Sequence, residues 1–262
     1  MTFSRLRDKQ EIERYLRGNV YLHIYSLGDL DDLFWSHTTW YGLSEEGHIE
    51  AVVLIYSGQS LPTVLALSDQ CEAVKELLAS MREILPEQFY AHLSGGVEVE
   101  LGGDFEMESH GEHWKMALWD RVIVSGWDCS GVAGLGPAEL DEILGFYERS
   151  YPGNWFDSRM LETGQYFGVR EGGVLVSAAG VHVYSPAYGV AALGNVATLP
   201  SHRGKGYAKA VMARLCRSLC GRVEHIGLNV KADNAAAISC YRKLGFEKVA
   251  TYGEFMVRRK RG

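Results

Sequence analysis

Cysteine and proline are both scarce in this sequence. The 262 residues include five cysteines and six prolines. No two cysteines have the CxxC spacing that is common in zinc sites and redox-active dithiols. An odd number of cysteines without paired spacing is typical of reduced thiols. We therefore predict a chain without a disulfide framework, and a cytoplasmic location.

Long apolar stretches are also missing. Residues 1–17 carry charges throughout and have no apolar core of the kind found in a signal peptide. Residues 174–201 contain no charged side chain and would be long enough for a membrane helix, but Gly180, Pro186 and Gly194 interrupt them. We expect this segment to form buried strands instead. No membrane partner is predicted.

The sequence has no excess of positive charge. Lys and Arg number 26 against 33 Asp and Glu, a net charge of −7, which argues against a nucleic-acid partner. Residues 1–125 hold 9 Lys and Arg against 21 Asp and Glu, whereas residues 126–262 hold 17 against 12. Several glycines between residues 126 and 136 accompany this change. We therefore predict two domains, residues 1–125 and 126–262, with any anionic ligand in the second.

Helical and strand patterns alternate in the second half. Apolar side chains recur at helical spacing after Pro137 and over residues 208–219 and 235–244, and a short helix is expected near residues 155–162. Strands are predicted over residues 166–170, 174–184, 188–198 and 225–230, with a closing hairpin over residues 246–257. This order predicts an α/β (α+β) fold in which a mixed, mostly antiparallel sheet is flanked by helices.

The first half repeats this order faintly. Helices are expected over residues 8–17, 29–35 and 71–85, and strands over residues 50–56, 63–67 and from 89 onward. Two interpretations are open: a duplicated fold without sequence identity between the halves, or an unrelated α/β domain.

A turn with two glycines joins the strand at 188–198 to the helix at 208–219. The first N–H groups of a helix lack intrahelical partners, the helix dipole adds positive charge, and glycine lets an anion approach the main chain. From residue 199 to residue 223 there is no acidic residue, and there are six basic ones: Arg203, Lys205, Lys209, Arg214, Arg217 and Arg222. A solvated basic helix face would account for the last three, but not for the glycine turn. The junction therefore predicts a phosphate-binding site.

A Rossmann dinucleotide fingerprint is the competing interpretation of this turn. After Gly204 and Gly206 the sequence has Lys209 where a third glycine is required, and the preceding strands form a predicted meander instead of starting a βαβ unit. Glu224 lies at the beginning of the next strand and not at its end. A Walker P-loop is absent from the sequence as well. An NAD(P)-dependent oxidoreductase is therefore the less favoured alternative.

Two segments resemble motifs of the GNAT superfamily of N-acetyltransferases. The first is Arg203-Gly-Lys-Gly-Tyr-Ala208, which matches the motif Arg/Gln-x-x-Gly-x-Gly/Ala and follows Val196-Ala-Thr198 at the usual distance. The second runs over residues 228–234 and continues through Ala237, Tyr241 and residues 244–246. The resemblance covers residues 136–257. It is closest to the branch that includes glycine N-acyltransferase-like proteins, to which residues 151–156 are also similar and whose members have a degenerate GNAT-like N-terminal half.

The resemblance implies an acyl-CoA-dependent N-acyltransferase that moves an acetyl or acyl group directly to an amine in a ternary complex. Acetyl-CoA would be the co-substrate, the acceptor a small amine or amino-acid-like molecule, and no metal would be needed. Each half would be a GNAT-like domain. Residues 1–125 would form the degenerate one without a CoA site, and residues 126–262 the catalytic one.

The resemblance also implies roles for individual residues. Backbone groups of Val196, Ala197 and Thr198 would pair with the pantetheine arm, Asn234 would contact that arm, and Tyr241 would protonate the departing thiolate. Tyr241 also fits the apolar stripe of its own helix, so a core role is the alternative. The pyrophosphate would be held by the turn residues Arg203, Gly204, Lys205, Gly206, Tyr207 and Ala208.

The general base is not evident from the sequence. An aliphatic amine has a pKa of about 10 and must lose a proton before it attacks an acyl carbon. The strand at 188–198, where relatives often place a glutamate, contains no Asp or Glu. The candidates are His182, Asp157, Glu162 and a water chain. The missing carboxylate also leaves a non-catalytic acyl-CoA sensor as an alternative function.

In the first half, residues 67–72 stand where the phosphate turn would be. They contain no glycine and two carboxylates, Asp69 and Glu72. These carboxylates suit a helix N-terminus and would repel a pyrophosphate, so no CoA site is predicted there. His110 and His113 lack the helical HExxH context of a zinc site and are expected in a turn between strands.

Overall fold

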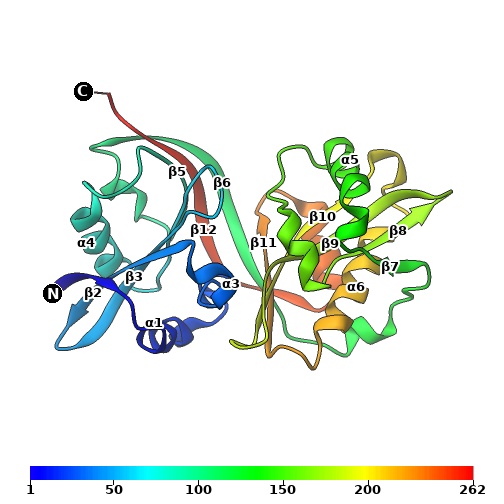
Figure 1. Ribbon diagram of the computed structural model, residues 1–262, viewed down its shortest axis with the longest axis horizontal. Coiled ribbons are helices and arrows are strands. Elements are labelled where there is room, and N and C mark those ends of the chain that lie inside the picture. The colour runs from blue at the N-terminus through cyan, green and yellow to red at the C-terminus, as the bar shows by residue number, and fades with distance from the viewer. Residues whose placement is uncertain (262) are drawn as a thin grey trace. The chain divides into compact units, whose positions relative to one another are not determined.

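The chain folds into two compact units in the computed structural model, which describes residues 1–261 (Figure 1). Unit 1 comprises Met1–Lys115, Lys231–Asp233 and the residues from Val249 onward, and unit 2 comprises Met116–Val230 and Asn234–Lys248. The two units are therefore not the contiguous halves, 1–125 and 126–262, that the change in charge suggested.

Strand β12 (Phe246–Arg259) is the main reason for this difference. It is one continuous strand, where the sequence predicted a hairpin. Its later residues pair antiparallel with β5 (Gln88–Leu93), with Gly253 opposite Leu93 and Arg258 opposite Gln88. Because the strand itself continues through Gly253, no turn forms there. The last part of the chain consequently belongs to unit 1, which local composition does not reveal.

Unit 1 is a mixed, mostly antiparallel sheet flanked by helices. Its strands follow the order β1-β2-β3-β4-β5-β12-β6, and β4 and β5 run parallel. The strands not yet defined are β1 (Thr2–Leu6), β2 (Thr38–Glu45), β3 (His48–Tyr56), β4 (Thr63–Ala66) and β6 (Phe105–Leu118). The helices are α1 (Lys9–Leu16), α2 (Ile24–Gly28), α3 (Asp32–Trp35) and α4 (Cys71–Met81), with 3-10 turns at Arg17–Asn19 and Glu98–Glu100.

Local sequence explains where the helices of unit 1 begin and what they bury. The carboxylate of Asp8 accepts hydrogen bonds from the backbone N–H groups of Gln10 at 2.8 Å and Glu11 at 3.3 Å, which caps α1. Helix α4 contributes a buried apolar stripe to the main core of the unit: Ala73, Val74, Leu77, Leu78 and Met81.

Unit 2 has the same type of sheet, in the order β11-β10-β9-β8-β7, and here β10 and β11 run parallel. Its strands are β7 (Val132–Gly134), β8 (Phe167–Glu171), β9 (Val174–Ser185), β10 (Val190–Thr198) and β11 (His225–Lys231). Its helices are α5 (Leu140–Ser150), α6 (Tyr207–Leu219) and α7 (Ala235–Lys243), with 3-10 turns at Ile123–Gly126, Pro137–Glu139, Ser158–Thr163 and Pro200–His202. Each unit thus combines a parallel pair with antiparallel ones, as a duplicated fold would.

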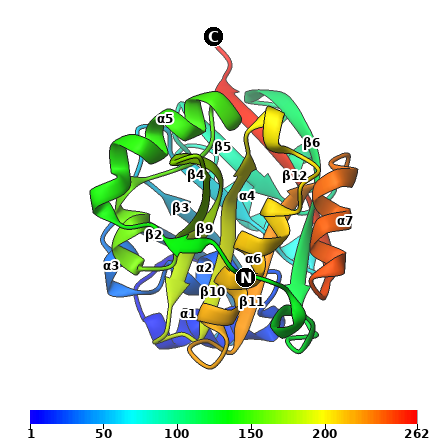
Figure 2. The same cartoon turned by 90° about the vertical axis from the view of Figure 1, so that its right-hand side faces the viewer.

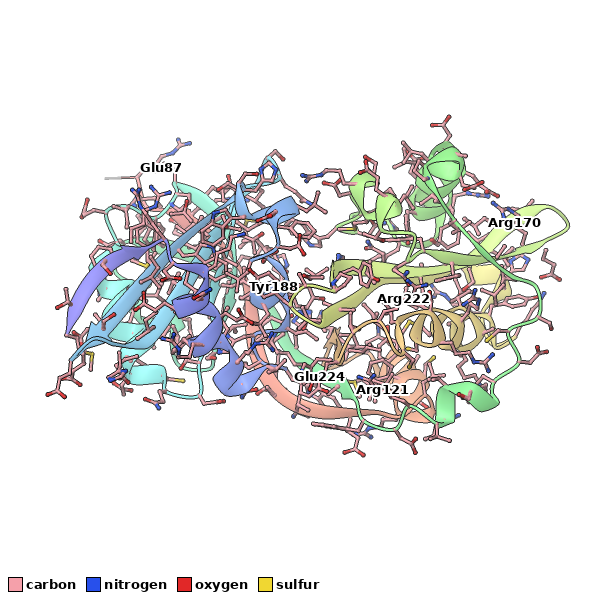
Figure 3. All side chains as sticks on the ribbon, turned by 60° about the horizontal axis from the view of Figure 1, so that its bottom comes forward. Glu87, Arg121, Arg170, Tyr188, Arg222 and Glu224 are labelled. Carbon is pink, nitrogen blue, oxygen red and sulfur yellow. The ribbon has the colours of Figure 1, made fainter. Side chains whose placement is uncertain are left out.

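Helices α5 and α6 cover opposite faces of the unit 2 sheet (Figure 2). Successive side chains of a strand point to opposite faces, and the end of β8 shows this directly. Arg170, labelled in Figure 3, pairs with Glu142 of α5. The next residue, Glu171, accepts a hydrogen bond from Tyr207 of α6. The α6 face is the one that leads to the predicted phosphate turn.

Most of the elements predicted from the sequence are confirmed within a few residues, but some differ. Strands β1, β2 and β7 were not expected; the first four residues of β1 are exposed, so it lacks the alternation of a half-buried strand. The helix expected at residues 29–35 is shortened to α3, and the one expected at 155–162 is the 3-10 helix Ser158–Thr163. No helix within residues 1–261 is both long and apolar enough to cross a membrane.

Asp29, directly after α2, is a carboxyl group buried in unit 1. Burial raises the pKa of Asp29 to about 8. The folded chain therefore holds this proton more tightly than the unfolded chain, and stability is lost as pH rises from about 4 to about 8. Asparagine cannot ionise, so we expect Asp29→Asn to gain about 1–3 kcal/mol relative to wild type between pH 5 and pH 8.

Urea unfolding of both chains at pH 5, 6.5 and 8 measures this gain. The matched control is Asp32→Asn, because Asp32 is exposed and pairs with Lys9 at 2.6 Å. We expect the control to follow the wild-type pH profile. Parallel profiles for wild type and Asp29→Asn would show that Asp29 does not titrate in this range.

Candidate cofactor and catalytic site

The parallel pairing between β10 and β11 stops before either strand ends. Its register runs from Val190 opposite His225 to Leu193 opposite Leu228. Strand β10 remains paired with β9 beyond that point, with register shifts between Ala192 and Leu193 and between Gly194 and Ala197. The next residue, Asn195, has a φ of 52°, which non-glycine residues rarely adopt. Strand β10 therefore carries a bulge where its pairing with β11 stops.

Buried hydrogen bonds hold this bulge. The hydroxyl of Tyr147 in α5 donates to the backbone carbonyl of Asn195 at 2.7 Å, and Nδ2 of Asn195 donates to the hydroxyl of Tyr166 at 2.8 Å. Tyr147, Tyr166 and Asn195 are all buried, so loss of any of these bonds would leave a polar group without water. The left-handed backbone at Asn195 is thus fixed by tertiary contacts.

After the bulge, the predicted pantetheine residues alternate in exposure. Val196 and Thr198 are half-buried, whereas Ala197 is buried. The hydroxyl of Ser177 in β9 lies 3.0 Å from the carbonyl of Ala197 and 2.9 Å from Oγ1 of Thr198. The structure therefore places Val196 and Thr198 on a partly open part of β10, while Ala197 faces the interior.

The phosphate turn follows the 3-10 turn Pro200–His202. Gly204 and Gly206 have φ values of 81° and 89°, which favour glycine, and Gly206 is the N-cap of α6. A Cβ atom on either glycine would meet no heavy atom within 4 Å, so the main chain is open to a ligand. The side chain of Arg203 donates from Nε to the carbonyl of Thr198 at 3.3 Å. An open helix N-terminus with basic neighbours fits a pyrophosphate.

A carboxylate lies beside the positive charges of this turn, although the sequence around the turn contains no acidic residue. Glu171 at the end of β8 lies 3.1 Å from Nζ of Lys205, and it accepts a hydrogen bond from the hydroxyl of Tyr207 at 3.0 Å. Nε2 of His202 lies 3.4 Å from the same carboxylate. The hydrogen bond from Lys205 is the largest of the effects that lower the pKa of Glu171. Residues 199–223 contain no acidic side chain, but the fold places Glu171 of β8 next to them.

The second motif forms the N-terminus and buried stripe of α7. Asn234 is the N-cap, and its side-chain oxygen accepts the backbone N–H of Ala237 at 3.1 Å. Tyr241 is only 8% exposed and packs 6.1 Å from the ring of Phe246, measured between ring centroids. Burial raises the pKa of Tyr241 above its usual value. Asn234 therefore caps α7, and Tyr241 is part of the hydrophobic core in addition to any catalytic role.

Among the candidate bases, the structure brings His182 to the bulge. A Cβ atom on Gly194 would lie 1.8 Å from Cδ2 of His182, so the half-buried imidazole lies directly on the backbone before Asn195. Asp157 is instead held by Arg159, with Oδ2 accepting from Nη2 at 2.6 Å and Oδ1 from the backbone N–H at 2.9 Å. Glu162 is exposed on its 3-10 helix. His182 is therefore the candidate best placed beside β10.

In unit 1 the corresponding parallel strands do not separate at their ends. Strands β4 and β5 pair as far as Ala66 and Leu93. Just beyond, the N–H of Ser68 donates to the hydroxyl of Ser94 at 2.9 Å, and the N–H of Ser94 donates to the carbonyl of Ala66 at 3.1 Å. These bonds continue to join the two chain segments where β10 and β11 are no longer paired.

No group of three or more His, Cys, Asp or Glu side chains within residues 1–261 is arranged to hold a metal ion. The sequence predicted that His110 and His113 lie in a turn between strands, but both lie inside β6. Gly111 between them has a φ of 93°, so the irregularity that suggested a turn is a local kink in one strand.

Sequence reasoning missed two residues of this site. Asn195 follows a glycine within a predicted strand, and such a pair is a known signal for a bulge. Glu171 had no local signal at all, because 34 residues separate it from Lys205. Its position is a consequence of how β8 packs against α6.

Comparison with known proteins agrees with this geometry. The Acetyltransferase (GNAT) family matches residues 135–246. The N-alpha-acetyltransferase RimI of Mycobacterium tuberculosis is 30% identical over 117 residues, covering 43% of this chain and 71% of that protein. Mycothiol acetyltransferase of Kineococcus radiotolerans is 38% identical over 52 residues, which is 20% of this chain and only 17% of the relative.

A solved structure resembles the whole chain. A tandem GNAT protein from the clavulanic acid biosynthesis pathway superposes with a TM-score of 0.60 and 14% identity, covering 98% of each chain. At this identity the likeness concerns the fold, and it supports two GNAT-like domains. The family match and the similarity to RimI show that the chain belongs to the GNAT family of acetyltransferases.

Proposed function

We propose that this chain transfers an acetyl or other acyl group from acyl-CoA directly to an amine in a ternary complex. The observation that carries the proposal is the junction in unit 2, where β10 leaves β11 after Leu193 and leads through two open glycines into the N-terminus of α6. Acetyl-CoA is the proposed co-substrate, and a small amine or amino-acid-like molecule the acceptor. We also propose that the chain belongs to the branch of glycine N-acyltransferase-like proteins. The similarity of residues 151–156 to that branch and the duplicated fold support this assignment.

Binding of the cofactor is assigned to two stretches. Backbone groups of Val196, Ala197 and Thr198 pair with the pantetheine arm, and the N–H groups of the turn hold the pyrophosphate. The half-buried state of Val196 and Thr198 supports this role better than the buried state of Ala197 does. The turn residues concerned are Arg203, Gly204, Lys205, Gly206, Tyr207 and Ala208. Asn234 adds a contact to the arm from the N-cap position of α7.

In the transfer step the amine nitrogen attacks the thioester carbonyl carbon, the C–S bond breaks and CoA leaves as a thiolate. His182 takes the proton that the amine must lose, and Tyr241 gives its proton to the thiolate. The hydroxyl of a tyrosine is protonated at neutral pH, as a proton donor requires. The nitrogen loses a second proton to solvent as the amide forms, solvent returns a proton to Tyr241, and His182 releases the first proton. The protonated amine and acyl-CoA thus give the amide, the CoA thiol and one released proton.

Unit 1 is proposed to bind no CoA. The hydrogen bonds of Ser68 and Ser94 close the gap into which an acyl-CoA arm would have to enter. Asp69 also accepts a hydrogen bond from Asn19 at 2.6 Å at the start of α4, where a phosphate would need positive charge. A support or acceptor-binding role for this unit is consistent with that arrangement.

Calorimetry with acetyl-CoA tests the proposal. We expect one site per chain and no binding of NAD or NADP. Release of free CoA in the presence of a panel of amines then separates an enzyme from a non-catalytic sensor. Tight acetyl-CoA binding without turnover for any amine favours the sensor, whereas NAD(P) binding in place of acetyl-CoA would contradict both.

Substitution of Tyr241 by phenylalanine tests the proton donor. Phenylalanine keeps the packing against Phe246 and removes the hydroxyl, so we expect kcat to fall about 100-fold with little change in acetyl-CoA affinity. Steady-state kinetics and calorimetry measure the two effects. Normal turnover of Tyr241→Phe would leave this residue with its core role alone.

A further inference from the structure

The end of β8 aims one carboxylate at the phosphate turn. Phe167 lies four residues before Glu171 in β8, and its ring centroid is 4.7 Å from the guanidinium carbon of Arg214 in α6. Glu171 therefore faces α6 as well, because residues four apart in a strand share a face. The next two residues, Gly172 and Gly173, have φ values of 59° and 83° and form a tight two-residue turn into β9. This hairpin fixes where the carboxylate of Glu171 lies.

The carboxylate engages side-chain donors that surround the backbone N–H groups of the proposed CoA site. Oε1 and Oε2 lie 3.2 Å and 3.1 Å from Nζ of Lys205, and Oε2 also accepts the hydroxyl hydrogen of Tyr207. His202, on the other side of the turn, lies 3.4 Å away. The side chains of Glu171 and Lys205 are each 45% exposed, so water and an incoming anion can reach them. The carboxylate thus already pairs with the polar side chains that an anion at this turn would meet.

We infer that Glu171 determines the affinity of the turn for phosphate groups, by competing with the ligand for Lys205, Tyr207 and His202. The inference rests on the proposed function, in which this turn holds the pyrophosphate of acyl-CoA. A phosphorylated ligand must take these donors from Glu171 or bind beside its negative charge. Both effects weaken binding in proportion to the phosphate charge of the ligand. A weaker hold on the phosphates also favours release of free CoA after transfer.

Calorimetry with acetyl-CoA, acetyl-dephospho-CoA and acetyl-pantetheine on wild type and Glu171→Gln tests this role. The amide keeps the size of the side chain and removes its charge. Because exposed ion pairs contribute little, we expect acetyl-CoA to bind about two- to fivefold more tightly to Glu171→Gln. Glu171→Lys should give a larger gain, of about tenfold. Binding of acetyl-pantetheine, which has no diphosphate, should be unchanged in both variants.

Two controls separate local competition from other effects. Glu142→Gln changes the net charge of the chain by the same amount, but its carboxylate pairs with Arg170 on the α5 face. We expect it to leave acetyl-CoA affinity unchanged. In a Lys205→Ala background, Glu171→Gln should have a smaller effect than in wild type, since the competed donor is missing. Thermal unfolding of each variant verifies that the fold is intact.

The outcomes are distinguishable. Tighter acetyl-CoA binding by Glu171→Gln, without a change for acetyl-pantetheine, supports the competition. Equal or weaker acetyl-CoA binding by Glu171→Gln overturns it while the proposed function stands. An equal gain for Glu142→Gln also overturns it, because the effect would then be a general one of net charge. A wild-type chain that binds no acetyl-CoA contradicts the proposed function itself, and this role with it.

Discussion

Replacement of Gly206 by glutamate should weaken acetyl-CoA binding by about 100-fold or more. Gly206 is the N-cap of α6, and its φ of 89° belongs to the region that favours glycine. A glutamate there would strain the turn and place a carboxylate at the end of the helix where the pyrophosphate is proposed to bind. The added carboxylate would repel the phosphate charge at close range, and its side chain would also cover the open main chain of the turn. Calorimetry with acetyl-CoA measures the loss.

The matched control for this variant lies at the other end of the same helix. Gly221, just beyond α6, has a φ of 82°, and a Cβ atom there would meet no heavy atom within 4 Å, as at Gly206. Gly221→Glu therefore adds the same charge and a similar backbone strain of about 1–2 kcal/mol, away from the turn. We expect normal acetyl-CoA affinity for Gly221→Glu and an intermediate loss for Gly206→Ala. If Gly206→Glu binds acetyl-CoA normally, the pyrophosphate does not bind at this turn.

Substitution of His182 by alanine should lower kcat by about 100- to 1000-fold, with acetyl-CoA affinity nearly unchanged. The imidazole lies on the backbone of Gly194, directly before the bulge at Asn195. His182 lies in β9, which pairs with β10, and not in the phosphate turn. Loss of the imidazole should therefore affect proton removal and not cofactor binding. Steady-state kinetics at saturating acetyl-CoA measure the effect.

The pH dependence of this variant distinguishes a base from a structural residue. An amine acceptor with a pKa of about 10 loses its own proton at high pH, so the defect of His182→Ala should shrink as pH approaches that value. A purely structural defect would persist at every pH. The control is His225→Ala, because His225 lies on β11, is 20% exposed and interacts with Glu224. We expect that variant to keep most of its activity.

Local periodicity predicted most elements of unit 2 and the main ones of unit 1. Helix α6 follows from the spacing of Val211, Leu215 and Leu219, all of which are buried. Strand β9 and strand β10 follow from apolar segments broken at Pro186 and Gly189. Such patterns lie within a few neighbouring residues, so they can be recognised without knowing the tertiary structure. The glycine turn at Gly204 and Gly206 belongs to the same class of local signal.

The errors concern contacts between distant parts of the chain. Charge and glycine content predicted a boundary at residue 125, but Arg258 pairs with Gln88 and the last strand lies mostly in unit 1. Pairing of this kind depends on strand register across the sheet, which local composition does not encode. The hairpin expected at residues 246–257 is wrong for the same reason, since β5 provides a continuous partner for β12.

Spacing within single segments was enough to recognise the family motifs, the order of most elements and the glycine turn before α6. Tertiary structure decided the conformation of Asn195, which Tyr147 and Tyr166 hold from other elements. It also decided the charge of the phosphate turn: residues 199–223 contain no acid, but the packing of β8 on α6 places Glu171 beside Lys205. Electrostatic interactions depend on distance in space and not on separation along the chain, and for that reason this contact could not be read from the sequence.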